Sequence, residues 1–281
     1  MTILRSKDEM RDQTRAWHAD GLRVAFVPTM GALHEGHVSL VHLAAKHADR
    51  IVVSIFVNPT QFGPHEDFAR YPRDEAGDLD RCRAAGVHAV FLPSVREMYP
   101  PDATVFVDEA KLSLGLCGAA RPGHFRGVLT VVAKLLLIVG PDVAVFGRKD
   151  AQQLALIERM VRDLDLPVRI LPAPILREPD GLAMSSRNRY LSPDERAHAL
   201  CLRRALDHAE AAFRGGATDA KTLLGELRTQ IEATPGTRID YVEAVDAATL
   251  EPVAVLRPNT LVALAVRVGA TRLIDNTVLG A

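Results

Sequence analysis

The stretch that decides the fold of this chain reads Pro28-Thr29-Met30-Gly31-Ala32-Leu33-His34-Glu35-Gly36-His37. It follows the apolar run Val24-Ala25-Phe26-Val27 and precedes residues with helical character, so it predicts a turn from a strand into a helix. The N-terminus of a helix carries unpaired N–H groups and a partial positive charge, which together suit a phosphate. His34 and His37 lie on nearly one helix face, where both can donate to one polyphosphate.

The spacing of the two histidines separates this turn from a metalloprotease helix. A zinc-binding His-Glu-x-x-His motif places its histidines four residues apart, whereas His34 and His37 are three apart. Two solvated surface histidines are the alternative interpretation of the pair. The position at the end of the first strand of an α/β pattern favours a ligand site, because open parallel sheets bind ligands at that edge.

Composition places few limits on the fold and more on the partners. The chain has 281 residues, enough for one large domain or two ordinary ones. Hydrophobic residues make up 48% and charged residues 25%, as in ordinary soluble globular proteins. Because 34 Lys and Arg nearly balance 35 Asp and Glu, we expect no nucleic-acid partner.

Neither membrane nor secretory signals are apparent in the sequence. Residues 1–9 are too charged for a signal peptide, and the apolar stretch 128–139 is interrupted by Lys134 and too short to span a bilayer. We therefore expect no membrane association. The cysteines show neither zinc-site spacing nor an even-numbered disulfide framework, which favours a cytoplasmic location. They are Cys82, Cys117 and Cys201.

Strand-like and helix-like runs alternate through the first two-thirds of the chain. The expected strands span residues 24–28, 50–58, 87–92, 104–107, 142–146 and 168–171. The expected helices span residues 36–48, 74–85, 127–139 and 151–163. This series predicts an α/β fold, a doubly wound, Rossmann-like parallel sheet with right-handed crossovers.

The pattern changes after the last of these strands. Prolines at 172, 174 and 179 suggest a hinge-like connection. Helices are expected at 193–214 and 217–233, and strands at 239–245, 260–268 and 271–276, the last two forming a hairpin. We therefore expect a Rossmann-like domain over residues 1–175 and a smaller α+β domain over residues 176–281 that acts as a lid.

Two polar clusters follow strands or precede a buried helix in the first domain. Asn58-Pro59-Thr60-Gln61-Phe62-Gly63 offers amides that suit a neutral or carboxylate ligand, with an ordinary Asn-Pro turn as the alternative. Arg121-Pro122-Gly123-His124-Phe125-Arg126-Gly127 leads into a buried helix and suits an anion. A solvated basic loop is the alternative for this second cluster.

Two further clusters carry groups suited to a nucleotide. In Phe146-Gly147-Arg148-Lys149-Asp150, Lys149 can reach a phosphate, while Asp150 can cap the following helix or hold a ribose hydroxyl. One of the two glutamines that follow, Gln152 or Gln153, should face the cleft. Met184-Ser185-Ser186-Arg187-Asn188-Arg189-Tyr190 offers hydroxyls and a guanidinium for a triphosphate, or is a surface loop before a helix.

The sequence lacks the Gly-x-x-x-x-Gly-Lys phosphate loop, the Gly-x-Gly-x-x-Gly fingerprint and the Gly-x-Ser-x-Gly elbow. Phosphate binding through histidines, a lysine and Ser-Ser-Arg instead indicates nucleotidyl transfer. In that chemistry a substrate oxygen attacks the α-phosphorus of ATP and diphosphate leaves.

Taken together and in this order, the motifs resemble those of pantoate–β-alanine ligases (pantothenate synthetases), nucleotidyltransferases with a His-x-Gly-His type signature. The resemblance covers essentially the whole chain. It rests on residues 28–37, 56–62, 71–73, 121–125 and 184–190, and on Gly147, Lys149, Asp150, Gln152 and Gln153.

The resemblance implies an ATP-dependent condensation of pantoate with β-alanine. The pantoate carboxylate attacks ATP to give pantoyl adenylate and diphosphate, and the β-alanine amine then gives pantothenate and AMP. The resemblance further implies that Mg²⁺ accompanies the ATP and that the chain forms a homodimer.

The resemblance also implies roles for individual residues. The catalytic residues are His34, His37, Lys149 and Asn58. The pantoate-binding residues are Met30, Gln61, Gln153, His124 and Arg121. The ATP-binding residues are Met30, His37, Gly147, Lys149, Asp150, Leu176, Met184, Ser185, Ser186 and Arg187.

The chain departs from the family pattern at two positions. Arg148 stands where family members commonly carry an acid. Gly77 precedes Asp78 where some members have two adjacent acids near the magnesium, so Asp78 is the remaining candidate ligand, with a solvated helix residue as the alternative.

Two rival functions remain at this point. A different adenylyl- or cytidylyltransferase would be indifferent to β-alanine. A nucleotide-binding regulatory module would dispense with the polar acceptor pocket around Gln61 and Gln153.

Overall fold

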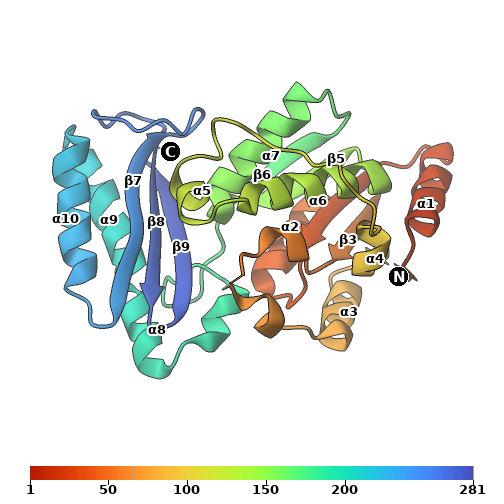
Figure 1. Cartoon of the computed structure of the whole chain (residues 1–281), viewed down its shortest axis with the longest axis horizontal. Coiled ribbons are helices and arrows are strands. Elements are labelled where there is room, and N and C mark those ends of the chain that lie inside the picture. The colour runs from red at the N-terminus through yellow and green to blue at the C-terminus, as the bar shows by residue number, and fades with distance from the viewer. Residues whose placement is uncertain (65, 281) are drawn as a thin grey trace. The chain divides into compact units, whose positions relative to one another are not determined.

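The computed structural model describes residues 1–64 and 66–280, which form two compact units (Figure 1). Unit 1 comprises Met1–Glu109, Arg121–Arg148 and Leu156–Pro174. Unit 2 comprises Ala110–Ala120, Lys149–Ala155 and Ile175–Ala281. The long C-terminal part of unit 2 starts next to the expected boundary, and two short earlier segments join it.

Unit 1 is built on a six-stranded parallel sheet with the order β1-β4-β3-β2-β5-β6. The strands are β1 (Thr2–Leu4), β2 (Val24–Thr29), β3 (Arg50–Ile55), β4 (Ala89–Phe91), β5 (Val143–Gly147) and β6 (Arg169–Ala173). From β2 the chain proceeds outward through β3 and β4, then returns to place β5 on the other side of β2. The switch point of the sheet therefore lies between β2 and β5, where such sheets bind ligands beyond the strand ends.

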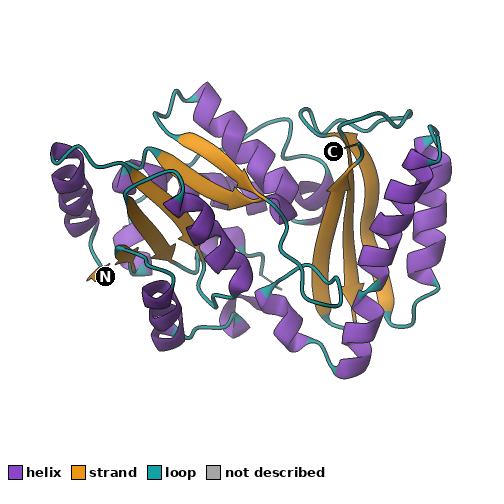
Figure 2. Ribbon diagram, turned by 180° about the vertical axis from the view of Figure 1, so that it is seen from behind, coloured by secondary structure: helices purple, strands orange, loops and turns teal. Residues whose placement is uncertain are grey.

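Helices cover both faces of this sheet (Figure 2). The principal ones are α1 (Lys7–Ala19), α2 (Glu35–Ala45), α3 (Glu75–Ala84), α6 (His124–Val139) and α7 (Ala151–Asp163). Helices α2 and α3 pack on one face in a cluster that includes Val27, Val41 and Val53. Helix α6 is nearly all buried, which explains its continuous apolar run. Shorter pieces are η1 (Pro59–Gln61), η2 (Asp67–Arg70), η3 (Arg148–Asp150), α4 (Val95–Met98) and α5 (Leu116–Ala120).

Unit 2 contains a three-stranded antiparallel sheet, β7-β8-β9. The strands are β7 (Thr237–Asp246), β8 (Thr260–Val268) and β9 (Thr271–Val278), packed against α8 (Pro193–Ala199), α9 (Cys201–Arg214) and α10 (Ala220–Glu232). Leu206, Leu227 and Val266 are fully buried between helices and sheet. A further short helix, η4 (Ser186–Tyr190), precedes α8. The parallel sheet and this smaller α+β unit confirm the predicted fold class.

Three local predictions were incomplete or wrong. Residues 104–107 form no strand and pair with no described strand; Val107 instead bonds through its N–H to Thr130 Oγ1 at 2.9 Å. Strand β1 and helix α1 were missed, although Ser6 and Glu9 form a capping box at the start of α1. The expected helix 193–214 is divided between α8 and α9 at Leu200.

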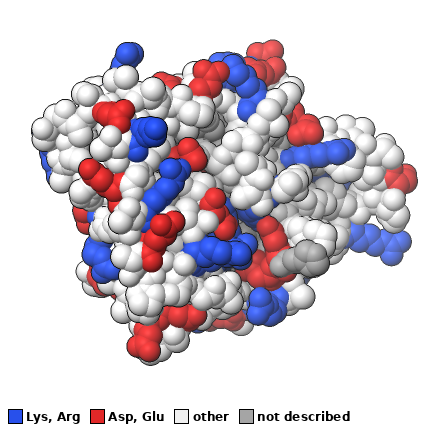
Figure 3. Space-filling view, turned by 60° about the vertical axis from the view of Figure 1, so that its left-hand side comes forward, with Lys and Arg blue, Asp and Glu red and all other residues white. Residues whose placement is uncertain are grey.

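The surface shows no dominant charge on the face drawn in Figure 3, where cationic and anionic side chains are interspersed. Among the described residues, no helix has the length and apolar character needed to cross a membrane.

We predict that Gly127→Ala destabilises the protein even though alanine favours a helix. A Cβ at Gly127, inside α6, would lie 2.3 Å from the Thr60 carbonyl oxygen in η1. The matched control is Gly225→Ala in the exposed part of α10, where nothing lies within 4 Å of the new methyl. Thermal denaturation should show a lower free energy of unfolding for Gly127→Ala. The control should show a free energy of unfolding that is higher by about 0.5–1 kcal/mol. A gain in both variants would contradict this packing.

Candidate functional site

The turn between β2 and α2 holds both histidines by their Nδ1 atoms. His34 is the N-cap of α2, and its Nδ1 accepts the Gly36 N–H at 3.1 Å. In return, His37 Nδ1 accepts the His34 N–H at 3.3 Å, and the two rings lie 4.1 Å apart. Because a backbone N–H is a donor, each Nδ1 must carry a lone pair. The neutral rings are therefore Nε2–H tautomers, so the donor atom of each ring is its Nε2.

Asn58 is buried and its side chain is committed to the protein. Its Nδ2 donates to Gln61 Oε1 at 3.0 Å and to the Gly127 carbonyl at 3.1 Å. Its Oδ1 accepts from Thr60 Oγ1 and from the Tyr99 hydroxyl, both at 2.9 Å. With 1% exposure, Asn58 orients Gln61 and does not offer an open surface to a substrate. Burial raises the pKa of Tyr99, so its hydroxyl keeps the proton that it donates.

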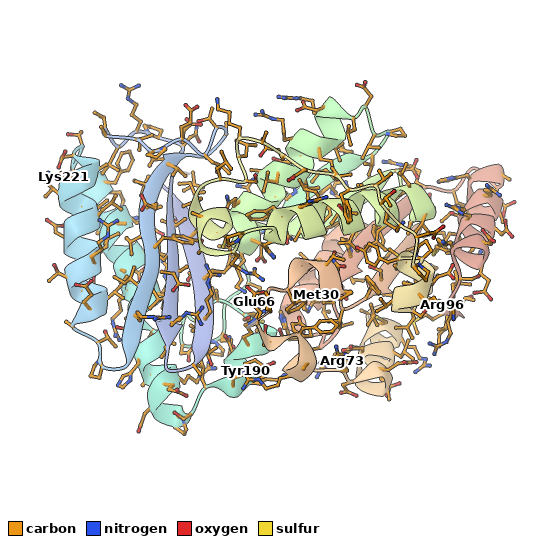
Figure 4. All side chains as sticks on the ribbon, viewed as in Figure 1. Met30, Glu66, Arg73, Arg96, Tyr190 and Lys221 are labelled. Atoms are coloured by element: carbon orange, nitrogen blue, oxygen red, sulfur yellow. The ribbon has the colours of Figure 1, made fainter. Side chains whose placement is uncertain are left out.

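Gln61 and Met30 are brought together at the end of β2. Gln61 Nε2 lies 3.1 Å from Met30 Sδ, and both side chains are only half-buried. Asn58 fixes the Gln61 oxygen, so the amide group has a defined direction. Met30, labelled in Figure 4, and Gln61 therefore form an apolar and a polar contact point on the same edge of the sheet as the histidine turn.

Arg121 and His124 are held in an ion-paired cluster. Arg121 Nε and one terminal nitrogen donate to the two Glu66 oxygens, each at 2.6 Å. Its other terminal nitrogen lies 2.9 Å from His124 Nε2, and His124 Nδ1 lies 2.9 Å from the Gln61 carbonyl oxygen. Since Arg121 can only donate, His124 Nε2 accepts and its Nδ1 carries the proton. Sequence analysis predicted that this basic loop binds an anion. In the structure the charge of Arg121 is neutralised by Glu66, which is labelled in Figure 4.

Glu66 has a lowered pKa. Partial burial acts to raise the pKa of this carboxyl, but the hydrogen bonds and the charge of Arg121 outweigh burial and hold the pKa below its usual 4.5. Glu66 is therefore ionised at neutral pH and ties the loop after β3 to the start of α6.

Asp78 is buried, which excludes the interpretation as a solvated helix residue. Its exposure is 3%, and its carboxylate accepts the backbone N–H groups of Ala32 and Leu33 at 2.9 and 2.7 Å. Both oxygens are thus turned toward the histidine turn. In the described part of the chain, no group of three or more His, Cys, Asp or Glu side chains could hold a metal ion.

The nucleotide candidates after β5 divide between the two units. Gly147 ends β5 in unit 1, and η3 with Lys149 and Asp150 follows at once. Lys149 is half-buried, and its carbonyl accepts from Asn276 Nδ2 at 2.8 Å within unit 2. Asp150 is exposed in the residue before α7, where it can cap or meet a ligand.

The two glutamines of α7 have different environments. Gln152 is buried and clamps the segment before and within α5: its Nε2 donates to the Leu112 and Gly115 carbonyls, both at 2.9 Å, and its Oε1 accepts the Cys117 N–H at 2.9 Å. Gln153 is half-buried. Gln153 is thus the more exposed of the two, and the pantoate-binding role that the resemblance implies for it stays a prediction.

In unit 2, hydrogen bonds from neighbouring side chains fix the loop that contains Met184, Ser185, Ser186 and Arg187. Buried Asn188 donates to Glu178 Oε1 at 2.6 Å and to the Ala183 carbonyl at 3.1 Å. Ser185 Oγ accepts the Arg187 N–H at 3.3 Å and so caps η4. Ser186 is 7% exposed, and Leu176 is on the surface of the same unit. This arrangement gives the loop a fixed backbone while Arg187 stays half-buried.

Sequence reasoning missed two groups that shape these clusters, Glu66 and Tyr99, and it named Gln152 without predicting its structural contacts. Each acts on a partner distant in sequence, as with Glu66 and Arg121, which are 55 residues apart. No local spacing marks such a pair. The sequence offered one indirect signal for Glu66: two cations in one loop beside a helix start favour a carboxylate nearby.

Comparison with known proteins gives a consistent result. A family model described as pantoate-beta-alanine ligase matches residues 2–278. Pantothenate synthetase from Trichlorobacter lovleyi is 53% identical over 280 residues, covering 100% of this chain and 99% of that protein. Pantothenate synthetase from Thermotoga petrophila is 52% identical over 280 residues and covers 100% of both chains.

Crystal structures extend the likeness to the fold. Pantothenate synthetase from Thermus thermophilus superimposes with a TM-score of 0.92 at 43% identity, over 99% of both chains. The pantoate-beta-alanine ligase of Francisella tularensis, complexed with beta-gamma ATP and beta-alanine, gives a TM-score of 0.83 at 32% identity, over 99% of this chain and 97% of that one.

We predict that Glu66→Gln destabilises unit 1 in a pH-dependent way. Because the folded carboxyl has a lowered pKa, its stabilising contribution is complete above the ordinary value of 4.5 and is lost as the pH falls through the lower folded value. Denaturant unfolding should therefore give the variant a lower free energy of unfolding than the wild type at pH 7. The difference between the two free energies should shrink below pH 4.5. The exposed acid in Asp80→Asn serves as the control. A difference that does not depend on pH would contradict the ion pair.

Proposed function

The chain belongs to the pantoate-beta-alanine ligase family, and we propose that the residues described above carry out its reaction in the following way. The enzyme condenses pantoate with β-alanine at the expense of ATP, through a pantoyl adenylate, and releases AMP and diphosphate. The observation that carries the residue assignment is the β2–α2 turn, where two Nε2–H donors stand at the switch point of a parallel sheet.

In the first step the pantoate carboxylate attacks the α-phosphorus of ATP, and charge accumulates on phosphate oxygens. His34 and His37 donate through Nε2–H to these oxygens, with the N-terminus of α2 behind them. Lys149 adds a point charge on the triphosphate, and Ser185, Ser186 and Arg187 grip it. No protein nucleophile is required, because the reaction depends on positioning and charge neutralisation.

The adenosine and the pantoate occupy separate groups of residues. Gly147, Asp150, Leu176 and Met184 contact the nucleoside, supported by their place after β5 and in the loop of unit 2. Met30, Gln61 and Gln153 hold pantoate, supported by the contact of Gln61 with Met30 and the half-buried position of Gln153. Asn58, Arg121 and His124 act on pantoate indirectly, by fixing Gln61 and its loop.

The β-alanine amine then attacks the acyl carbon of the adenylate, and AMP departs. We propose that unit 2 acts as a lid that excludes water from the adenylate, because its Ser-Ser-Arg loop follows the proline-rich connection after β6. Hydrogen exchange across residues 172–190 tests this idea, and identical exchange with and without ATP would contradict it.

Mg²⁺ is proposed as the companion of ATP, bound through phosphate oxygens, as is usual for this ion. We propose that Asp78 does not bind this ion, because the residue is 3% exposed and both of its oxygens are turned toward backbone N–H groups. We therefore assign no catalytic step to a protein-bound metal.

A homodimer and a cytoplasmic location complete the proposal. The family resemblance supports the dimer, and Val105 and Phe106 offer exposed apolar side chains, at 86% and 45%, on a segment that pairs with no described strand. Light scattering on the purified protein tests the dimer. Three free, buried cysteines agree with a reducing compartment.

The reaction is tested by AMP release from the purified protein with Mg²⁺, ATP and pantoate, with and without β-alanine. We expect AMP and pantothenate in equal amounts, and only when both substrates are present. ATP consumption that ignores β-alanine would indicate another nucleotidyltransferase.

We predict that His37→Ala and Lys149→Ala each lower kcat by about a hundredfold or more, because removing one donor to a developing charge costs about 2.7–4 kcal/mol. Lys221→Ala, on the exposed surface of α10, is the control and should keep full activity. Thermal melts establish that each variant is folded. Near-normal turnover by a folded His37→Ala protein would remove that histidine from the mechanism.

A further inference from the structure

The turn that carries the two histidines has a backbone that does not form easily on its own. Gly31 has φ +83° and Ala32 has φ +50°, so two consecutive residues lie in the left-handed region. An L-residue such as Ala32 seldom adopts this conformation without outside support. Some other part of the molecule must therefore hold the turn in place.

The support comes from Asp78, in the first turn of α3. Its Oδ2 accepts the Ala32 N–H at 2.9 Å, and its Oδ1 accepts the Leu33 N–H at 2.7 Å, across 46 and 45 residues of sequence. The side chain is 3% exposed. A carboxylate that is buried to this extent is retained only when it is hydrogen-bonded, and bonds to an ionised acceptor are the stronger kind.

Gly31 matches this contact sterically. A Cβ built on Gly31 would lie 2.8 Å from Asp78 Oδ2 and 3.1 Å from Ile55 Cγ2. Glycine is therefore required at this position for two reasons: the positive φ, and the close approach of the carboxylate. Gly31 and Asp78 therefore depend on each other: the Asp78 carboxylate can approach the turn only because Gly31 has no side chain.

The turn held in this way leads directly into the reciprocal cap of α2. Leu33, whose N–H is bound by Asp78, immediately precedes His34, whose own N–H is bound by His37 Nδ1. Every backbone N–H from Gly31 to His34 thus has an acceptor, since the Gly31 N–H bonds to Thr29 Oγ1 at 3.2 Å. A shift of the first part of this series would be transmitted to both imidazoles.

We propose that Asp78 is a positioning residue for the adenylation reaction, which fixes the Gly31–Leu33 backbone so that the two imidazoles face the reacting phosphate. Asp78 acts through the turn and touches no substrate. The inference rests on the proposed roles of His34 and His37. This role differs from that of a metal ligand. If the carboxylate bound Mg²⁺, replacing Asp78 would raise the Mg²⁺ concentration needed for half-maximal activity.

The test compares Asp78→Asn with Asp80→Asn, an exposed acid on the same helix. Asp78→Asn keeps the shape but turns an amide N–H₂ toward a backbone N–H. We expect kcat to fall by about a hundredfold, the loss typical of a small misplacement of catalytic groups. The KM for β-alanine and the Mg²⁺ concentration for half-maximal activity should stay unchanged. The ¹⁵N signals of the His34 and His37 side chains should shift in Asp78→Asn and not in the control.

Gly31→Ala provides a second approach with the carboxylate intact. It should reproduce the loss in kcat and the shifted imidazole signals, and the double variant should be no worse than the poorer single one. Gly31→Ala also decides the matter if Asp78→Asn fails to fold.

Three outcomes would overturn the proposal: normal kcat in folded Asp78→Asn, a raised Mg²⁺ requirement, or additive losses in the double variant. If the wild type made no pantothenate, the proposed function would fall. The imidazole signals would still report whether Asp78 holds the turn.

Discussion

The interaction on which the site depends is the reciprocal hydrogen bonding between the backbone and the imidazoles at the start of α2. A helix N-terminus has N–H groups that need acceptors, and here two histidine Nδ1 atoms supply them. The consequence is chemical as well as structural. With both Nδ1 atoms used as acceptors, the protons reside on Nε2, and the turn presents two donors beside the positive end of a helix. This capping arrangement is the basis on which we propose that the turn binds an anion.

The sheet determines where this turn lies. The order β1-β4-β3-β2-β5-β6 makes β2 and β5 neighbours at the switch point, so the turn after β2 and the Gly147 end of β5 meet the same edge. The loop after β3 is then tied to α6 by Asn58, and to the residues just before α6 by the Glu66–Arg121 pair. Asn58, whose predicted role toward substrate stays a prediction, fixes its neighbour in the folded chain and so gives the Gln61 amide a defined direction.

Much of this could be predicted from the sequence, because the signals are local. The apolar runs of β2 and β3 are buried on both faces, and α6 carries its apolar residues at helical spacing. The spacing of the two histidines and the position of their turn after an apolar strand predict phosphate binding. The fold class and the family membership are confirmed, whereas the roles of individual site residues stay predictions.

The remaining features depend on contacts between distant residues. Asp78 resembles a solvated residue of a polar helix, and only the folded chain shows that it binds Ala32 and Leu33. Gln152 and Gln153 are chemically identical in the sequence, but α7 buries one and leaves the other half-exposed. Residues 104–107 have strand-like composition, but they pair with no described strand. Local sequence propensity does not show which distant residues a segment will contact. In all three cases the presence or absence of such a contact determines the local structure.

The most direct test of this account is the protonation state of the two imidazoles, measured by ¹⁵N-edited NMR of the histidine side chains at neutral pH. The chain has 10 histidines, so His34→Gln and His37→Gln would assign the two signals. The account predicts that both rings carry the proton on Nε2 in the free protein and that ATP shifts the Nε2–H signals. A proton on Nδ1 of either ring would mean that the reciprocal cap does not exist in solution, and would contradict the central claim.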